Sequence, residues 1–305
     1  MITIFTVPKA FEGFFDTIQR NAILSWKKLR PEPEIILFGL ESGVAKTAAE
    51  FTVRHIPEIE KNELGTPLVN SAFELARKIA QNNLLVYADC DVILMNDLIS
   101  AIKLVKLPIF LMASQRWNLE IKNPIRFQDS DWEEKLRNRL VKEGELASPA
   151  AMDYFAFPRN LKVDFPNFII GRQAWDDWFL YKVRSLGVPM IDATKMVIAI
   201  HQKHDYSHLK RVGQYNLETK KSIDLLGGFH RTFTLRDADW ILTSQGLKKR
   251  RFFSLKSRAG YRYLTSFLNT YPYFDPGLKL LFFPAWLVTS IAKKIRRLFL
   301  KLIKK

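Results

Sequence analysis

The chain has 305 residues, of which 48% are hydrophobic and 26% charged, as in ordinary globular proteins. This length suits one large domain, or one domain with an appendage. The single cysteine excludes an internal disulfide framework, and no uninterrupted apolar run is long enough to predict a membrane-spanning helix. The first residues, "MITIFTVPKAF", lack the features of a secretory signal, so we expect a cytoplasmic protein.

The net charge of +16 is concentrated near the C-terminal end. Residues 248–305 contain 15 Lys and Arg side chains against one acid, Asp275, whereas residues 1–247 contain 32 basic and 30 acidic side chains. The sequence therefore predicts two parts, a nearly neutral body at 1–247 and a basic segment at 248–305.

Short β-branched runs alternate with amphipathic patterns over the first 115 residues. Strands are predicted at 2–7, 34–40, 51–57, 84–94 and 108–114, and helices at 14–29, 67–81 and from about 97. This alternation predicts an α/β fold in which helices cover both faces of a mostly parallel sheet.

The second half begins with a polar insertion at 115–150, where "QDSDWEEKLRNRLVKEGEL" predicts a charged surface helix. Apolar segments return at 151–159 and 168–208. Within the latter we expect a loop at Gly171, a helix from about Gln173 to Leu186 and a strand near 195–201.

The stretch "LLVYADCDVIL" places Asp89 and Asp91 at the carboxyl end of an apolar strand. Ligands bind doubly wound sheets outside the carboxyl ends of their strands, and side chains two apart on an extended chain share a face. The pair could therefore hold a divalent cation that neutralises a diphosphate, the alternative being a strand end with two solvated aspartates. We expect Asp91→Asn to remove most of any activity that depends on this cation. Because facing carboxylates repel, the substitution should leave the metal-free fold intact or slightly more stable.

The motif "WDDW" places Asp176 and Asp177 in the first turn of a predicted helix, between aromatic residues. Acids at this position stabilise a helix through its dipole. They could instead supply a general base, since apolar surroundings disfavour the ionised carboxylate and raise its basicity. We prefer Asp176 as the base, with Asp177 as its partner or substitute.

The segment "IHQKHDYSH" contains His201, His204 and His208. Two imidazoles three residues apart could share a metal on a helix, but the preceding "KMVIAI" predicts a strand. We therefore expect at most one of them, His201, to complete a metal site. Histidines with only hydrogen-bonding roles are the alternative.

In this order, the segments resemble the GT-A-type glycosyltransferases, and the resemblance extends from Ile2 to about His208. It is carried by "TVPKAF", the helix with Asn70, "YADCDVIL", "FIIGRQAWDDWF" and "IHQKHDYSH". The resemblance implies an enzyme that transfers a sugar from a nucleotide-sugar donor to an acceptor hydroxyl with the help of Mn²⁺ or Mg²⁺. A carboxylate base further implies inversion at the sugar carbon.

The resemblance also implies roles for individual residues. Asp91, with Asp89 and His201, would form the metal site, and Asp89 would touch the ribose or a metal-bound water. The nucleotide donor would be bound by Thr6, Val7, Pro8, Asn70 and Asp89, and Arg172 would meet phosphate or acceptor.

The basic segment ends in a pattern typical of interfacial helices. From Ile291 onward, apolar residues recur at spacings of three and four, and lysines and arginines fill the other face. We expect 248–305 to bind an anionic membrane surface at the inner face of the membrane, near a lipid-linked or other glycan acceptor, as in polysaccharide biosynthesis. A helix docked on the protein is the alternative.

Two other functions compete with this interpretation. A nucleotidyltransferase of the same fold type usually has a Gly-rich basic loop after its first strand, and "TVPKAFEG" offers only Gly13 and Lys9. A non-catalytic nucleic-acid-binding protein would explain "KKRRFFSLKSRAGYRY", but it leaves the acidic pair and "WDDW" unexplained.

Overall fold

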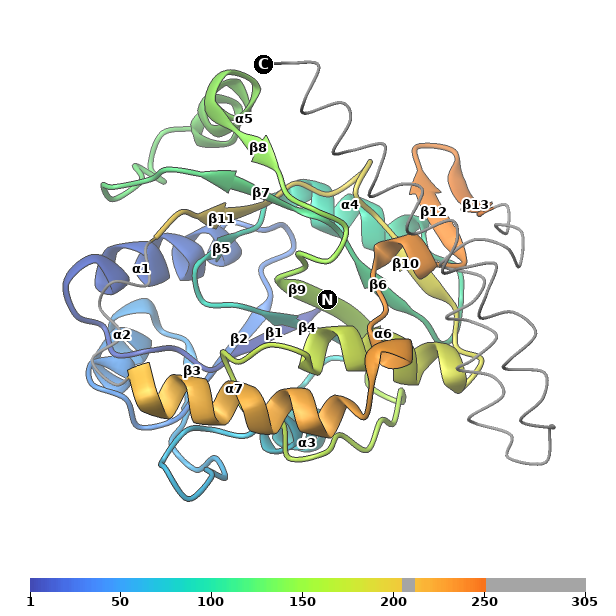
Figure 1. Cartoon of the computed structure of the whole chain (residues 1–305). Coiled ribbons are helices and arrows are strands. Elements are labelled where there is room, and N and C mark those ends of the chain that lie inside the picture. The colour runs from blue at the N-terminus through green and yellow to red at the C-terminus, as the bar shows by residue number, and fades with distance from the viewer. Residues whose placement is uncertain (205–211, 251–305) are drawn as a thin grey trace, which may run out of the picture.

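Nine strands of the described residues form one central sheet, in the order β13-β12-β10-β6-β9-β4-β1-β2-β3 (Figure 1). The computed structural model describes residues 1–204 and 212–250. The strands of this sheet are β1 (Thr3–Thr6), β2 (Glu34–Phe38), β3 (Arg54–Ile56), β4 (Leu84–Ala88), β6 (Leu111–Ala113), β9 (Tyr154–Pro158), β10 (Met190–Asp192), β12 (Trp240–Thr243) and β13 (Gly246–Lys249).

Most neighbours in this sheet are parallel, as the sequence predicts. β1 pairs in parallel with β2 and β4, and β10 pairs in parallel with β6 and β12. β9 is the exception near the centre, because it runs antiparallel between β4 and β6. Its first residue, Tyr154, therefore pairs with Ala88, the last residue of β4.

A second, smaller sheet lies beside the first (Figure 1) and consists of β5 (Val92–Ile93), β11 (Ala199–Gln202), β7 (Arg116–Leu119) and β8 (Glu145–Leu146). In its register His201 pairs with Val92 on one side and Asn118 on the other. The small sheet thus brings His201 next to the residue that follows Asp91.

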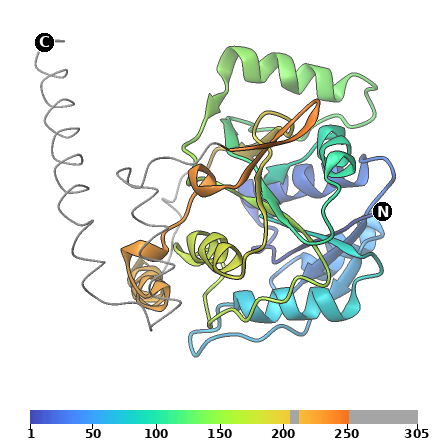
Figure 2. The ribbon, with the colours of Figure 1, turned by 90° about the vertical axis from the view of Figure 1, so that its right-hand side faces the viewer.

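Helices cover both faces of the central sheet. One apolar core contains Phe5 with Phe73 of α3 and Phe179 of α6, and the other contains Ile4 with Trp26 of α1. Ile4 and Phe5 point to opposite faces, as successive strand residues do. Helix α5 packs on the small sheet in a third core (Figure 2). The α-helices are α1 (Gly13–Lys27), α2 (Val44–Phe51), α3 (Val69–Ile79), α4 (Asn96–Leu104), α5 (Trp132–Glu143), α6 (Trp175–Ser185) and α7 (Val212–Leu226), with short 3₁₀ helices η1 (Phe229–Arg231) and η2 (Leu235–Asp237).

Two predicted elements differ from the structure. Residues 44–51 form α2, so the strand predicted at 51–57 is confined to Arg54–Ile56. An eight-residue helix spans barely two turns, which is too short to show a clear helical period. The strand predicted at 84–94 is divided into β4 and β5 by a turn at residues 89–91.

The described part of the chain continues past the predicted boundary at residue 247. β13 extends to Lys249, and the Arg250 guanidinium lies 2.6 Å from the Asp192 carboxylate. The predicted interfacial helix lies outside the described residues. Among those described, no helix combines the length and the apolar character needed to cross a membrane.

Candidate active site

The turn between β4 and β5 separates the two aspartates rather than aligning them on one extended strand. The backbone N–H of Val92 donates to the Asp89 carbonyl at 3.0 Å, and that of Asp89 donates to the Asp153 carbonyl at 2.9 Å. The turn gives the two side chains different partners. Asp89 meets a tyrosine and Asp91 meets histidines.

Asp91 lies against two imidazoles. His204 Nε2 is 3.1 Å from Asp91 Oδ2, and His201 Nδ1 is 3.5 Å from Asp91 Oδ1. Burial opposes ionisation of Asp91, but His201, His204 and the Lys9 cation outweigh it and hold the pKa of this carboxyl well below its usual range. One potential ligand atom from each of Asp91, His201 and His204 lies within 4.8 Å of the others.

His201 also faces a carboxylate that the sequence did not single out. Asp153, which is 4% exposed, places Oδ2 at 3.2 Å from His201 Nδ1. Burial lowers the pKa of His201, but Asp153 and Asp91 outweigh it and raise the pKa to about 10. Arg116 Nη1 in turn lies 3.0 and 3.1 Å from the two carboxylate oxygens of Asp153.

The pKa of Asp89 is raised, whereas that of Asp91 is lowered. Its Oδ1 accepts a hydrogen bond from the Tyr87 hydroxyl at 2.7 Å. Burial, with the charges of Asp153 and Asp91, raises the pKa of Asp89 to about 8 against the effect of that hydrogen bond. Asp89 is therefore mostly protonated at neutral pH, whereas Asp91 is ionised.

The group formed by Asp91, His201 and His204 fits a divalent metal ion. Asp91 Oδ1 and His201 Nδ1 are buried, and neither makes a hydrogen bond of good geometry within the described ranges. Buried polar atoms normally have a hydrogen-bond partner, so a cation between the carboxylate and the imidazole would supply the missing partner of both atoms. Carboxylate oxygen and imidazole nitrogen are both established ligands of divalent transition metals.

Helix α6 begins beside this group. Trp175 packs edge-on against Tyr87, with ring centroids 5.2 Å apart, and so anchors the first turn of α6 to β4. Burial, with a smaller contribution from Asp153, raises the pKa of Asp176 to about 6 against the backbone N–H groups of Asp177 and Asp176 and the Arg116 cation, which lower it. Asp153, which lies beside His201, therefore also influences the pKa of Asp176. Asp177 lies half-buried in the same turn.

Thr6 is the last residue of β1, and Val7 and Pro8 follow it in a loop next to the end of β4. The buried Gln19 of α1 holds this loop, because its side chain accepts from the Lys9 N–H at 2.7 Å and donates to the Lys9 carbonyl at 3.1 Å. The predicted contact of Thr6–Pro8 with a nucleotide stays a prediction, made at the edge where the structure also places Asp91.

Asn70 and Arg172 lie on neighbouring segments with partners of their own. Asn70 Nδ2 donates to Asn167 Oδ1 at 3.2 Å. The Arg172 guanidinium donates to the fully buried Glu218 at 2.6 and 3.0 Å, and it lies over the Tyr215 ring. Their proposed roles toward donor or acceptor stay predictions.

Sequence reasoning excluded His204 as a second metal ligand and missed the Asp153–Arg116 pair. The argument that His201 and His204 could approach one ligand only on a helix was wrong, because His201 lies on β11, His204 follows the end of this strand at Gln202, and both rings lie against Asp91. Asp153 precedes an apolar strand, "YFAFP", and such an acid is a usable signal. It reaches the site only because β9 runs antiparallel, which the sequence did not reveal.

No family model and no curated protein matches the chain. Among solved structures, a mannosyltransferase from Pyrobaculum calidifontis in complex with GDP-Man and Mn²⁺ is 16% identical, with a TM-score of 0.45, and the match covers 73% of this chain and 64% of that one. Glucosyl-3-phosphoglycerate synthase from M. tuberculosis is 14% identical, with a TM-score of 0.44, and the match covers 76% of this chain and 80% of that one. The same synthase in complex with Mn²⁺, UDP and phosphoglyceric acid is 14% identical, with a TM-score of 0.42, over 74% of this chain and 77% of that one.

These structural neighbours are glycosyltransferases. At such identities, and with TM-scores below 0.5, they assign this chain neither a substrate nor the role of any residue. The function therefore rests on its own site.

Proposed function

We propose that this protein is a metal-dependent glycosyltransferase that moves a sugar from a nucleotide-sugar donor to an acceptor hydroxyl. The observation that supports it is the meeting of three parts at one edge of a mostly parallel sheet. These are the Asp91–His201–His204 group, the loop with Thr6–Pro8, and the acidic first turn of α6. The carboxyl edge of such a sheet is where ligands bind.

In this proposal Asp91, His201 and His204 hold the metal ion. A bound ion supplies positive charge that neutralises the donor diphosphate and the departing nucleotide. Two imidazole nitrogens favour a transition ion over Mg²⁺, which prefers oxygen ligands, so Mn²⁺ is the better fit of the two. Asp89 can accept a hydrogen bond from a ribose hydroxyl.

The acceptor is activated by Asp176 in this proposal. The acceptor hydroxyl oxygen attacks the anomeric carbon, its proton passes to the Asp176 carboxylate, and the bond from that carbon to the diphosphate oxygen breaks. With a pKa of about 6, Asp176 is ionised at neutral pH and more basic than an exposed aspartate. A single displacement of this kind inverts the configuration of the sugar carbon. Asp177 is the partner or the substitute.

The proposal includes an anionic membrane surface as a partner. Residues 251–305 contain 12 Lys and Arg side chains against one acid, which supports peripheral binding at the inner face of a membrane near a lipid-linked or other glycan acceptor. Sedimentation with anionic and neutral liposomes tests it, comparing the full chain with a chain ending at Arg250, which keeps β13 intact. We expect binding to anionic liposomes only, and loss of it on truncation; equal binding to both lipids, or unchanged binding after truncation, would overturn it.

A thermal-shift panel of UDP, GDP and their sugar conjugates, each with and without Mn²⁺, tests the enzymatic proposal. A bound donor stabilises the folded protein by mass action, about 2.7 kcal/mol at a hundred times its Kd. We expect at least one nucleotide to raise the Tm only when Mn²⁺ is present. If no nucleotide shifts the Tm, or if the shift is the same in EDTA, the proposal fails.

A further inference from the structure

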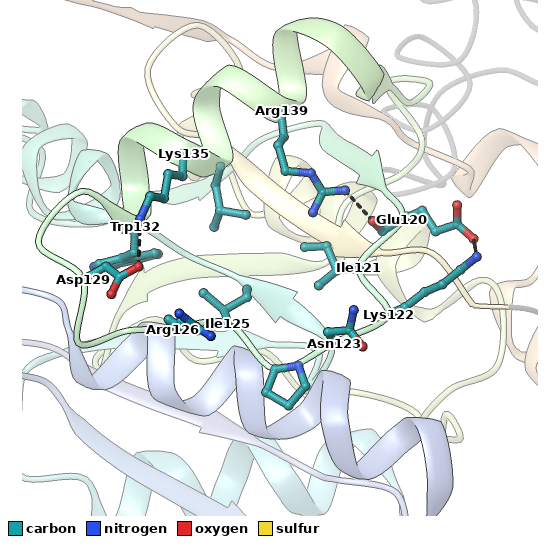
Figure 3. A pocket seen from close by; sticks show the side chains of 12 residues that line it. Glu120, Ile121, Lys122, Asn123, Ile125, Arg126, Asp129, Trp132, Lys135 and Arg139 are labelled. Carbon is teal, nitrogen blue, oxygen red and sulfur yellow. Dashed lines mark hydrogen bonds and ion pairs between the residues drawn. The ribbon is translucent and has the colours of Figure 1, made fainter.

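A cavity of about 470 Å³ lies between the segment 120–126, which follows β7, and helix α5 (Figure 3). Figure 3 shows Lys135 and Arg139 reaching from α5 toward the segment that carries Arg126. Ile121 and Leu136, which are 3% and 4% exposed, form part of its apolar wall. Neither the metal site nor the base uses this cavity.

Three of the cations around the cavity are neutralised within the protein. Lys135 Nζ lies 2.7 Å from Asp129, Arg139 lies 2.8 Å from Glu143, and Lys122 lies 3.0 Å from Glu120. Arg126, in contrast, forms no ion pair within residues 1–204 and 212–250. The cavity therefore offers, beside an apolar wall, a guanidinium that forms no ion pair with the described residues, although its charge also acts on the nearby Asp129 carboxylate.

This combination suits a sugar that carries an acidic group. A guanidinium matches a carboxylate or a phosphate with two parallel hydrogen bonds. The apolar wall suits the C–H face of a pyranose ring, as apolar linings with a few placed polar groups do for small ligands generally.

Two buried amides connect the cavity to the candidate metal site. Asn21 accepts from the Ile125 N–H at 2.9 Å and donates to the Asn123 carbonyl at 3.2 Å. Asn21 Nδ2 also donates to Gln202 Oε1 at 3.0 Å, and Gln202 Nε2 donates to the Asp91 carbonyl at 3.0 Å. Asn21 is 1% exposed and Gln202 is fully buried, so the cavity wall and Asp91 are held on one rigid frame.

We propose that this cavity binds an acidic sugar residue of the acceptor glycan, with Arg126 pairing with its carboxylate or phosphate group. The acceptor role rests on the proposed glycosyltransferase function, whereas binding of an acidic saccharide to the cavity does not. The fixed connection through Asn21 and Gln202 would give a bound acceptor a constant position relative to Asp91.

The test is isothermal titration of the full chain in the absence of donor and metal. The probes are a trisaccharide containing one glucuronic acid, the same trisaccharide with its carboxyl group reduced to the alcohol, glucose 6-phosphate and inorganic phosphate. We expect the uronic trisaccharide or the sugar phosphate to bind, and the reduced trisaccharide to bind at least about tenfold more weakly, the scale of one charge-assisted hydrogen bond. Which of the two binds identifies the acidic group.

Arg126→Gln is expected to weaken binding of the charged saccharide by about tenfold to a hundredfold. Arg236→Gln is the matched control, since Arg236 is also exposed but lies outside the cavity, and its affinity should equal that of the wild type. The proposal is overturned if no charged saccharide binds, if the reduced trisaccharide binds equally well, if inorganic phosphate alone binds as tightly, or if Arg126→Gln binds like the wild type. Because donor and metal are absent, these results are independent of whether the chain transfers sugar.

Discussion

Asp153, the residue just before the antiparallel strand β9, places Oδ2 at 3.2 Å from His201 Nδ1. The same aspartate accepts the Asp89 N–H through its carbonyl and binds Arg116 through its carboxylate. Asp153 thus connects the turn that carries Asp91 to the imidazole beside it. Because Asp153 approaches the same imidazole nitrogen that faces Asp91 Oδ1, its carboxylate would add a second negative charge beside a cation bound there.

Asp153→Asn should therefore weaken Mn²⁺ binding by about tenfold, because it removes one of the negative charges beside the ion. The amide keeps the size of the side chain but removes the charge that holds His201. Electron paramagnetic resonance of free Mn²⁺ measures the affinity directly, without an activity assay. Asp164→Asn, at an exposed acid away from the site, is the control. Equal Mn²⁺ affinities for Asp153→Asn and the wild type would show that the Asp153 charge does not contribute to metal binding.

Metal binding should release a proton from His201. Its pKa of about 10 means that the imidazole is protonated in the metal-free protein at neutral pH, and a metal ion can bind only the neutral ring. Mn²⁺ affinity should therefore rise by close to tenfold per pH unit between about pH 7 and 9. Calorimetry in two buffers of different ionisation enthalpy should give about one released proton per ion. An affinity that stays constant over this range would contradict the protonated state of His201.

Asp176→Asn should reduce turnover by about a hundredfold or more, with little change in donor affinity, because general-base help is lost. Since the pKa of Asp176 is about 6, wild-type turnover should also fall as the pH drops below 6 and the base becomes protonated. Steady-state kinetics from pH 5 to 8 check both statements. If Asp177→Asn loses most of its turnover and Asp176→Asn keeps the wild-type turnover, the two roles are exchanged. If both keep normal turnover, this helix holds no base and an inverting mechanism loses its support.

Asp89→Asn should stabilise the metal-free protein at pH 8. The folded pKa of about 8 lies above the unfolded value, so the stability that Asp89 contributes is fully present below about pH 4 and is lost as the pH rises through 8. Asparagine avoids this loss, which is on the order of a few kcal/mol. Thermal unfolding in EDTA should show a higher Tm for Asp89→Asn at pH 8 and a smaller difference at pH 4. A lower Tm for the variant at pH 8 would refute the raised pKa.

Sequence analysis predicted this stabilising effect for Asp91→Asn, whereas the structure favours it for Asp89→Asn. It assumed that Asp89 and Asp91 face each other and repel, which would make Asp91→Asn neutral or stabilising without metal. In the structure Asp91 instead pairs with His201 and His204, so the same substitution removes favourable contacts. We now expect Asp91→Asn to be destabilising in the metal-free protein.

The elements that sequence analysis predicted correctly depend on local pattern. β4 is a continuous apolar run that ends at an acidic pair, and α6 shows the helical period directly after "GRQA". Each pattern can be recognised within about a dozen residues. The two patterns were enough to predict the strand end with Asp89 and Asp91 and the helix start with Asp176.

What could not be predicted depends on contacts between distant parts of the chain. Asp153 reaches His201 because β9 enters the sheet in the reverse direction, and a strand's apolar pattern does not encode its direction. Gln202 and Asn21 are 181 residues apart and read as ordinary polar residues, yet together they hold the Asp91 carbonyl. Only the tertiary structure shows that these amides support the candidate site.

The most direct test of the central claim is hydrolysis of nucleotide sugars by the full chain, measured as nucleotide release across a panel of UDP- and GDP-sugars with Mn²⁺ or with EDTA. The proposed site predicts release from at least one donor with Mn²⁺, little or none in EDTA, and loss of most of the activity in Asp91→Asn, whose folded state is checked by circular dichroism. The same rate of release in EDTA, or an Asp91→Asn protein as fast as the wild type, would contradict a metal-dependent transferase centred on Asp91.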